Sequence, residues 1–291
     1  MTDELETYRR EIDRLDEQLA ELLKARLGIV KKVGTYKERN GSPPCPIRPG
    51  REATMLRRIA TLFAGSDFAP AAAAQLWRTI IGTSTALEAR LSISIYAPGE
   101  NRDLFWLARE YFGPAAILTR QPHVKRVIGD VMDGTAAVGI IPPLSFEPES
   151  HWWSHMLAGN GDSPKIFAHL PFVYHGEDPK HFPSALAFAK LAPEDSGDDV
   201  SLFVLQADHN VSQHRLQTAF GSAKLSVNWV AICSLSPDQR HHIVEIKGFV
   251  TPEHAGFKSF LAGLGDAIQQ AHFLGAYAVP FTIEEKKEEK I

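Results

Sequence analysis

The stretch TDELETYRREIDRLDEQLAELLKARLGIVKKVGTYKERNG, residues 2–41, decides the fold of the first part of the chain. Thr2 and Asp3 are residue types that cap helix N-termini, and Asn40-Gly41 is a strong stop signal. Between them, a heptad pattern repeats at alternating steps of three and four. This seam consists of Leu5, Tyr8, Ile12, Leu15, Leu19, Leu22, Arg26, Ile29, Val33 and Tyr36. One long helix is therefore predicted, and a seam of this length needs partner helices in a bundle or a dimer.

The pattern changes near residue 91, where helical periodicity gives way to alternating strands and helices. Two shorter helices, after Pro49 and after Pro70, complete an all-α domain predicted over residues 1–90. Residues 91–193 read as a βαβαβ α/β lobe with further strands, and residues 194–283 read as βαββαβ, a small α+β sandwich. Residues 284–291 form a charged tail that we expect to be solvated. The predicted fold class is thus multidomain, with an all-α part followed by α/β and α+β parts.

The composition excludes several kinds of partner. A net charge of −4 argues against a nucleic-acid partner, which normally leaves a basic footprint. We find neither an apolar run of about 18 residues nor a charged-then-apolar leader, so we expect no membrane span, no secretory signal and a cytoplasmic location. Cys45 and Cys233 lie far apart without metal-ligand spacing, and we expect reduced thiols. Because there is no ligand cluster, P-loop or GxGxxG after a strand, no metal or cofactor is predicted.

Cationic and polar residues interrupt the apolar faces of the helical part. Arg26 is the only charged residue on the seam, and a buried guanidinium needs an anion, from another helix or from a ligand. Lys37 lies on nearly the same face, roughly 16 Å further along the axis. Arg51 lies at a helix N-terminus, which favours anions. Ser84 and Glu88 share a face at a spacing of four residues. Together these residues predict a pocket for a small polyanion.

Arg9 adds a geometric constraint. It precedes Arg26 by roughly 25 Å along the same helix, too far for both side chains to serve one pocket from one chain. Arg9 is therefore either a solvated helix residue or a contribution from a dimer partner.

The polar residues of the helical part lie in motifs with a distinctive order and spacing. They are Arg9 in YRREIDRLDEQL, Arg26 in LLKARL, Lys37 in VGTYK, Arg51-Glu52 in IRPGRE, and Ser84 and Glu88 in IIGTSTALE. With these motifs, residues 5–90 resemble the all-helical class of chorismate mutases. Members of that class are intertwined homodimers in which an arginine of the first helix crosses into the partner's site. The resemblance implies that chorismate is the substrate and that it is rearranged to prephenate in a one-substrate pericyclic step.

The resemblance also implies a role for each site residue. Catalysis needs preorganised binding of the reactive conformer and stabilisation of charge on the breaking ether oxygen. Arg9 from the partner, Arg26 and Arg51 would clamp the carboxylates, Lys37 would donate to the ether oxygen and a carboxylate, Glu52 would hold the ring hydroxyl, and Ser84 would be a supporting donor.

Two positions depart from the family pattern. Glu88 stands where the family usually has glutamine, although a fungal branch is similar in having glutamate. An ionised Glu88 would repel the developing negative charge, so we expect activity to depend on protonated Glu88 and to decline as pH rises. Arg48 stands where the family often has an acidic residue, which leaves open how this loop contacts the ring hydroxyl.

The rest of the chain carries a second set of motifs. They include ISIYAPGENRDLFWLAREYFG, VIGDVMDGTAAVGIIPP, HHIVEIKGFV and FLGAYAVP. With them, residues 91–283 resemble a shortened prephenate dehydratase followed by its ACT regulatory domain. The functional motifs differ, however. Pro142-Pro143-Leu144-Ser145 replaces a Pro-Ile-Glu-Asn run, Leu186-Ala187-Phe188 replaces a Thr-Arg-Phe run, and Cys233-Ser234-Leu235-Ser236 replaces a Glu-Ser-Arg-Pro motif.

We therefore expect a chorismate mutase with a non-catalytic extension of regulatory or structural role. One alternative is a bifunctional chorismate mutase/prephenate dehydratase. Another is a non-catalytic sensor of aromatic metabolites that keeps only the binding pocket.

Overall fold

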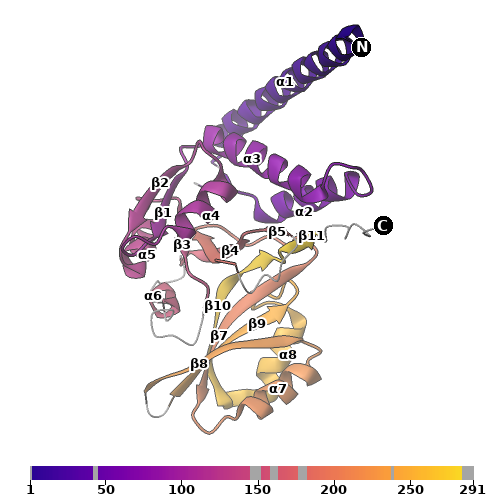
Figure 1. Cartoon of the computed structure of the whole chain (residues 1–291). Helices are drawn as coiled ribbons and strands as arrows, with labels where there is room; N and C mark the ends of the chain where they lie inside the picture. The colour runs from indigo at the N-terminus through magenta and orange to yellow at the C-terminus, as the bar shows by residue number, and fades with distance from the viewer. Residues whose placement is uncertain are drawn as a thin grey trace.

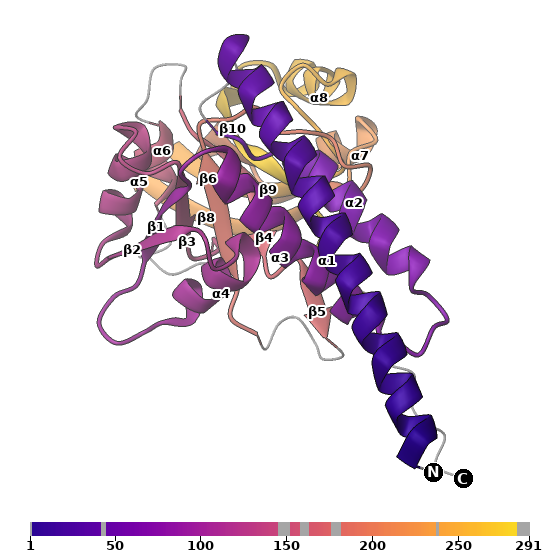
Figure 2. The ribbon, with the colours of Figure 1, turned by 90° about the horizontal axis from the view of Figure 1, so that it is seen from above.

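The first helix is 38 residues long, and it projects from the rest of the molecule (Figure 1). This helix, α1 (Thr2–Arg39), is followed by α2 (Pro49–Leu62) and α3 (Pro70–Glu88). The computed structural model describes residues 2–41, 45–144, 152–157, 163–175, 182–236 and 239–283. Figure 2 shows α1 lying across the pair formed by α2 and α3, with its N-terminal end beyond both. The helical part predicted for the beginning of the chain is confirmed.

The heptad seam of α1 is uncovered in the single chain. Its nine apolar members are each 42–69% exposed, although each is a large side chain. Leu62 at the end of α2 and Leu87 near the end of α3 are more than half exposed too. A seam of this length is not stable in water without a partner surface. Within the described residues, α1 packs mainly on α3, and no other element covers the seam.

The chain after α3 forms one nine-stranded sheet in the order β2-β1-β3-β6-β4-β10-β7-β9-β8. Its first part contains β1 (Ser92–Tyr96), α4 (Asp103–Phe112), β2 (Ile117–Gln121), α5 (Val124–Met132), β3 (Val138–Ile141), α6 (Trp153–Leu157), β4 (Lys165–Leu170), β5 (Val173–His175) and β6 (Ala185–Ala189). Strand β1 is parallel to β2 and β3, as the predicted βαβαβ order requires. Strands β3 and β6 are buried throughout, because protein packs on both of their faces.

The second part is a βαββαβ unit, as predicted. It contains β7 (Asp199–Asp208), α7 (Gln213–Ser222), β8 (Val227–Ser236), β9 (Gln239–Lys247), α8 (Ala255–Leu264), a short 3-10 helix (Gly265–Ala267) and β10 (Ile268–Ala278). Helices α7 and α8 lie on the same side of the antiparallel strands (Figure 1). Phe220 and Phe260 stack between the two helices with ring centroids 3.9 Å apart.

Strand β10 joins the two predicted C-terminal parts into one sheet. It pairs antiparallel with β7 and parallel with β4, the latter through Gly275 opposite Ile166. The boundary that we expected at residue 193 therefore does not separate two sheets. The stretch KIFAHLPFVYH forms two strands rather than one, and the first of them, β4, ends at Leu170. Pro171 lacks a backbone N–H, and β5 beyond it pairs instead with β11 (Phe281–Ile283). The predicted tail 284–291 and Ser145 lie outside the described residues.

None of the described helices combines the length and apolarity needed to cross a bilayer.

Buried histidines make the fold sensitive to acid. Burial lowers the pKa of His169 on β4 and of His242 on β9 to about 4 in each case. Neither ring nitrogen of His242 has a hydrogen-bond partner among the described residues. Such a histidine stays neutral in the folded protein but protonates near pH 6.5 in the unfolded protein. Above pH 6.5 it is neutral in both states, so the stability of the protein does not change there. Stability is then lost as pH falls from 6.5 toward 4.

We expect each of these two groups to contribute a loss of the order of 2 kcal/mol across that window. Urea denaturation of His242→Phe at pH 7.0 and pH 4.5 should show a smaller loss than the wild type shows. The exposed His214 on α7 offers the matched control, since His214→Gln should lose as much as the wild type. An equal loss in His242→Phe and wild type would contradict this assignment.

Candidate active site

The face between α1 and α3 carries two polar contacts, whose α3 residues, Ser84 and Glu88, lie one helical turn apart. Arg26 on α1 donates from Nη1 to the Oγ of Ser84 on α3 at 2.7 Å. Ser84 donates in turn to the carbonyl of Ile80 at 2.7 Å, which fixes its hydroxyl. Arg26 forms no ion pair with any described residue, so its contact with the Ser84 hydroxyl leaves its positive charge uncompensated. This is the arrangement of a side chain that can receive an anion.

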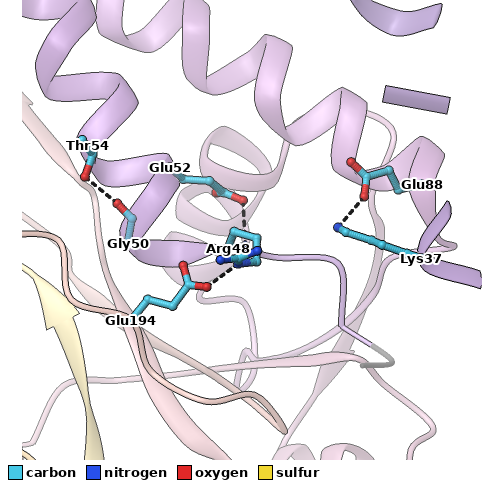
Figure 3. Close-up of polar contacts among 7 residues, drawn as sticks. All are labelled: Lys37, Arg48, Gly50, Glu52, Thr54, Glu88 and Glu194. Atoms are coloured by element: carbon cyan, nitrogen blue, oxygen red, sulfur yellow. Dashed lines mark hydrogen bonds and ion pairs between the residues drawn. The ribbon is translucent and has the colours of Figure 1, made fainter. Parts of the chain in front are cut away.

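The second contact is an ion pair. Lys37 Nζ lies 2.9 Å from the Oε2 of Glu88, and the two side chains are 28% and 15% exposed. Figure 3 shows the pair reaching from α1 to α3. Gly34, one turn before Lys37, faces the Glu88 side chain, where a Cβ would make an ordinary contact of 3.8 Å. The ammonium and the carboxylate neutralise each other in this structure, so a ligand must draw Lys37 away from Glu88.

Glu52 is held in a buried ion pair that the sequence did not predict. Its Oε2 lies 2.7 Å from Nη1 of Arg78 on α3, and the side chains are 9% and 5% exposed. The other oxygen, Oε1, accepts a long hydrogen bond of 3.4 Å from the backbone N–H of Arg48 (Figure 3). The guanidinium carbon of Arg78 lies 4.4 Å from the ring centroid of Tyr111 on α4. Glu52 is therefore fixed between the loop before α2 and the interior of the protein.

Cys45 lies in the loop before α2. The thiol is buried, and burial raises its pKa to about 11, with the charge of Glu52 raising it further and that of Lys37 lowering it. Since both charges act on one thiol, the loop at Cys45 connects the surroundings of Lys37 with those of Glu52. The sequence had suggested only a reduced thiol, and this position could not have been found from spacing alone.

Arg51 faces a different surface. With Arg48 and Arg58 it lines a shallow hollow beside α2 that also includes Glu194 and Asp195. Arg48 forms an ion pair with Glu194 there (Figure 3). Arg26 and Lys37 do not line this hollow. The structure thus brings Arg26, Ser84, Lys37 and Glu88 together and leaves Arg51 apart from them.

Arg9 is solvent-exposed in the single chain. Its Nη1 lies 2.9 Å from Oε1 of Glu6 on the same helix, and both side chains are more than half exposed. Arg9 and Arg26 lie on the same continuous helix, so the helical rise puts them roughly 25 Å apart along its axis.

Residues 194–198, between β6 and β7, are fastened to α2. Arg57 donates to the carbonyls of Ser196, Asp198 and Val279 at 3.0, 2.8 and 3.1 Å, and to the Oγ of Ser196 at 3.0 Å. At Gly50 the backbones approach so closely that a Cβ would lie 2.7 Å from the carbonyl oxygen of Asp195. Both contacts are on the helix that carries Arg51 and Glu52. No motif or spacing in the sequence predicts this attachment.

Within the described segments, His, Cys, Asp and Glu side chains do not gather in groups of three or more that could hold a metal ion.

The three helices and the polar contacts between α1 and α3 form a small helical domain. Comparison with known families makes the class specific. Residues 8–89, which include α2, α3 and most of α1, match the family model described as chorismate mutase type II.

A curated relative extends this similarity. The bifunctional chorismate mutase/prephenate dehydratase of Aquifex aeolicus (strain VF5) is 29% identical over 143 residues, which are 48% of this chain and 39% of that protein. The chain therefore matches well under half the length of this relative.

Solved structures resemble the remaining part of the chain. Prephenate dehydratase from Streptococcus mutans superposes with a TM-score of 0.48 at 16% identity, over 66% of this chain and 99% of that one. Prephenate dehydratase from Arthrobacter aurescens, in complex with L-Phe, gives a TM-score of 0.46 at 14% identity, over 65% of this chain and 90% of that one. GqqA, described as a novel type of quorum quenching acylase, gives a TM-score of 0.48 at 10% identity, over 65% of this chain and 95% of that one.

Proposed function

We propose that this protein is a chorismate mutase, which isomerises chorismate to prephenate within a homodimer in the cytoplasm. The observation that carries the proposal is the polar face between α1 and α3. There, in the segment that matches the family, Arg26 and Lys37 face Ser84 and Glu88 across two short contacts. No covalent intermediate is needed, so a site of cations and hydrogen-bond donors is chemically sufficient.

Each side chain then has a stated task. Arg26, Arg51 and an Arg9 from a second copy bind the two carboxylates of chorismate, because the planar fork of arginine suits a carboxylate. Lys37 donates to the ether oxygen on which negative charge develops. Glu52 accepts a hydrogen bond from the ring hydroxyl, and Ser84 supports Arg26. For Arg51 to join the site, its side chain must turn from the hollow beside α2 when the anion binds.

A second copy of the chain explains two features at once. It would cover the exposed seam of α1, which is a large apolar stripe on an otherwise polar helix. It would also supply an arginine where this chain cannot, since Arg9 lies roughly 25 Å from Arg26 on a straight helix.

The decisive test follows chorismate consumption by purified protein, wild type beside Arg26→Ala. We expect turnover in the wild type and a loss of about 10²-fold or more in kcat/KM in the variant. A wild type that binds chorismate without consuming it would favour the sensor alternative and overturn the proposal.

The crossing of Arg9 predicts complementation between two inactive variants. Arg9→Ala and Arg26→Ala should each be inactive, because each homodimer lacks one clamp in both sites. A mixed dimer has one site with both arginines intact and one site with neither. After unfolding and refolding together in equal amounts, the mixture should therefore recover about a quarter of the wild-type activity.

The control for this recovery is Arg10→Ala mixed with Arg26→Ala, in which Arg10 is an exposed neighbour. The activity of that mixture should be proportional to its share of Arg10→Ala subunits, whichever partner each of them has. Absence of recovery in the Arg9→Ala and Arg26→Ala mixture would show that Arg9 does not cross.

Glu88→Gln should change how activity depends on pH. The glutamine amide donates a hydrogen bond at every pH, whereas Glu88 donates only when protonated and otherwise pairs with Lys37 at 2.9 Å. We expect the wild-type kcat to decline as pH rises, and the kcat of Glu88→Gln to be flat over the same range. Steady-state assays from pH 5 to pH 9 measure this. Parallel profiles for the two proteins would contradict the role of Glu88.

For residues 91–283 we infer a regulatory or structural role, with ACT-like character in the βαββαβ unit. The bifunctional alternative is favoured by the name of the Aquifex relative. Against it, Leu186, Ala187 and Phe188 are apolar and buried in β6, where they cannot reach a substrate. An assay for phenylpyruvate after addition of prephenate decides between the two.

A further inference from the structure

Arg78 occupies an unusual place for a charged residue. It lies within α3, is 4% exposed, and has its guanidinium between the Glu52 carboxylate and the Tyr111 ring. The three residues come from α2, α3 and α4, so the first helix of the α/β part takes part in the arrangement. Its Nε has no hydrogen-bond partner among the described residues. Arg78 is thus committed to one carboxylate and one aromatic ring.

A buried ion pair gives little net stability compared with a well-packed apolar pair. Its consequence here is geometric. Arg78 engages Oε2 of Glu52 and leaves Oε1 facing the loop of Arg48 and Cys45, on the side where the charge of Lys37 is also felt. The guanidinium lies over the Tyr111 ring and contacts the carboxylate through Nη1 alone, which limits how that carboxylate can turn.

We propose that Arg78 is a positioning residue of the mutase site, which holds the Glu52 carboxylate so that its Oε1 is presented to the ring hydroxyl of chorismate. With Oε2 engaged by Arg78, Oε1 is the oxygen that can accept that hydrogen bond. Without Arg78, the carboxylate would lose the contact that holds its Oε2 and could turn away from the loop of Arg48. The inference rests on the proposed function and adds to it a contribution from Tyr111 on α4.

The test uses the full-length protein and two substrates, chorismate and an analogue that lacks the ring hydroxyl. Arg78→Met removes the charge while retaining much of the apolar volume. We expect it to lower kcat/KM for chorismate by up to about 10²-fold, since a small misplacement of a binding group has this effect. The analogue cannot use Glu52, and its kcat/KM should change little.

The double variant Arg78→Met/Glu52→Gln removes both charges of the buried ion pair together. It replaces Arg78→Met in the comparison if that single variant does not fold. Because Arg78 acts through Glu52, the double variant should be no slower than Glu52→Gln alone. Arg78→Lys should recover only part of the activity, since it keeps the charge but loses the planar fork.

Equal losses on both substrates, or a double variant slower than Glu52→Gln, would show that Arg78 only supports packing and would overturn the inference. A wild type that does not consume chorismate overturns the proposed function instead, so the two failures are distinguishable.

Discussion

Lys37→Ala is expected to lower kcat for chorismate by about three orders of magnitude, with a much smaller change in KM. Lys37 is the cation placed to donate to the ether oxygen, and charge appears on that oxygen mainly in the transition state. Removal of one such donor from a preorganised site typically lowers kcat by a factor of 10² to 10³. The loss should fall on kcat because the arginines, which hold the carboxylates, remain.

Lys32 provides the matched control, since it lies on the same helix and is exposed. Lys32→Ala should retain the wild-type kcat. Circular dichroism should show that Lys37→Ala remains folded, although Glu88 loses its partner. A fall in kcat of less than tenfold would mean that another group stabilises the ether oxygen.

Gly275→Ala is expected to destabilise the protein by more than about 4 kcal/mol, or to prevent folding. Gly275 has φ of 142°, which side-chain-bearing residues rarely adopt. It also lies opposite Ile166, where a Cβ would be 2.1 Å from the carbonyl oxygen and 2.4 Å from the backbone nitrogen. Backbone atoms on both sides cannot move without breaking the pairing of β10 with β4.

Gly263→Ala is the same substitution at a position where it should raise the stability of the protein. Gly263 lies within α8 with nothing near the place of a Cβ, so alanine should stabilise the helix by about 0.5–1 kcal/mol. Denaturant unfolding of both variants measures the difference. A Gly275→Ala protein as stable as the wild type would show that β10 and β4 can separate at no cost.

The sequence predicts most of the elements because local signals set them. The heptad pattern and the Asn40-Gly41 stop define α1, and prolines mark the starts of α2 and α3. The βαββαβ order follows from strand and helix periods. The pairing of β4 with β10 could not be predicted in this way, because a single register position joins residues more than a hundred apart.

In the site, too, the contacts that follow from local spacing could be predicted and those that depend on tertiary packing could not. Contacts between Arg26 and Ser84 and between Lys37 and Glu88 agree with the spacing of polar residues on two helical faces. Arg78 in LWRTIIG interrupts an apolar helix much as Arg26 does, and that signal could have identified it. Its partners could not, since Glu52 and Tyr111 meet it only through the packing of three helices. Whether Arg51 and Arg9 join the site stays a prediction.

The attachment of residues 194–198 to α2 makes the helical part dependent on sequence far downstream. Arg57 satisfies carbonyls that lie 139 and 222 positions further along the chain. A fragment that stops near residue 90 would leave this guanidinium facing solvent and bare the surface at Gly50. A self-contained helical bundle could be separated from the rest of its chain and keep its shape. Here, separation would remove residues 194–198, which hold α2, the helix that carries Arg51 and Glu52.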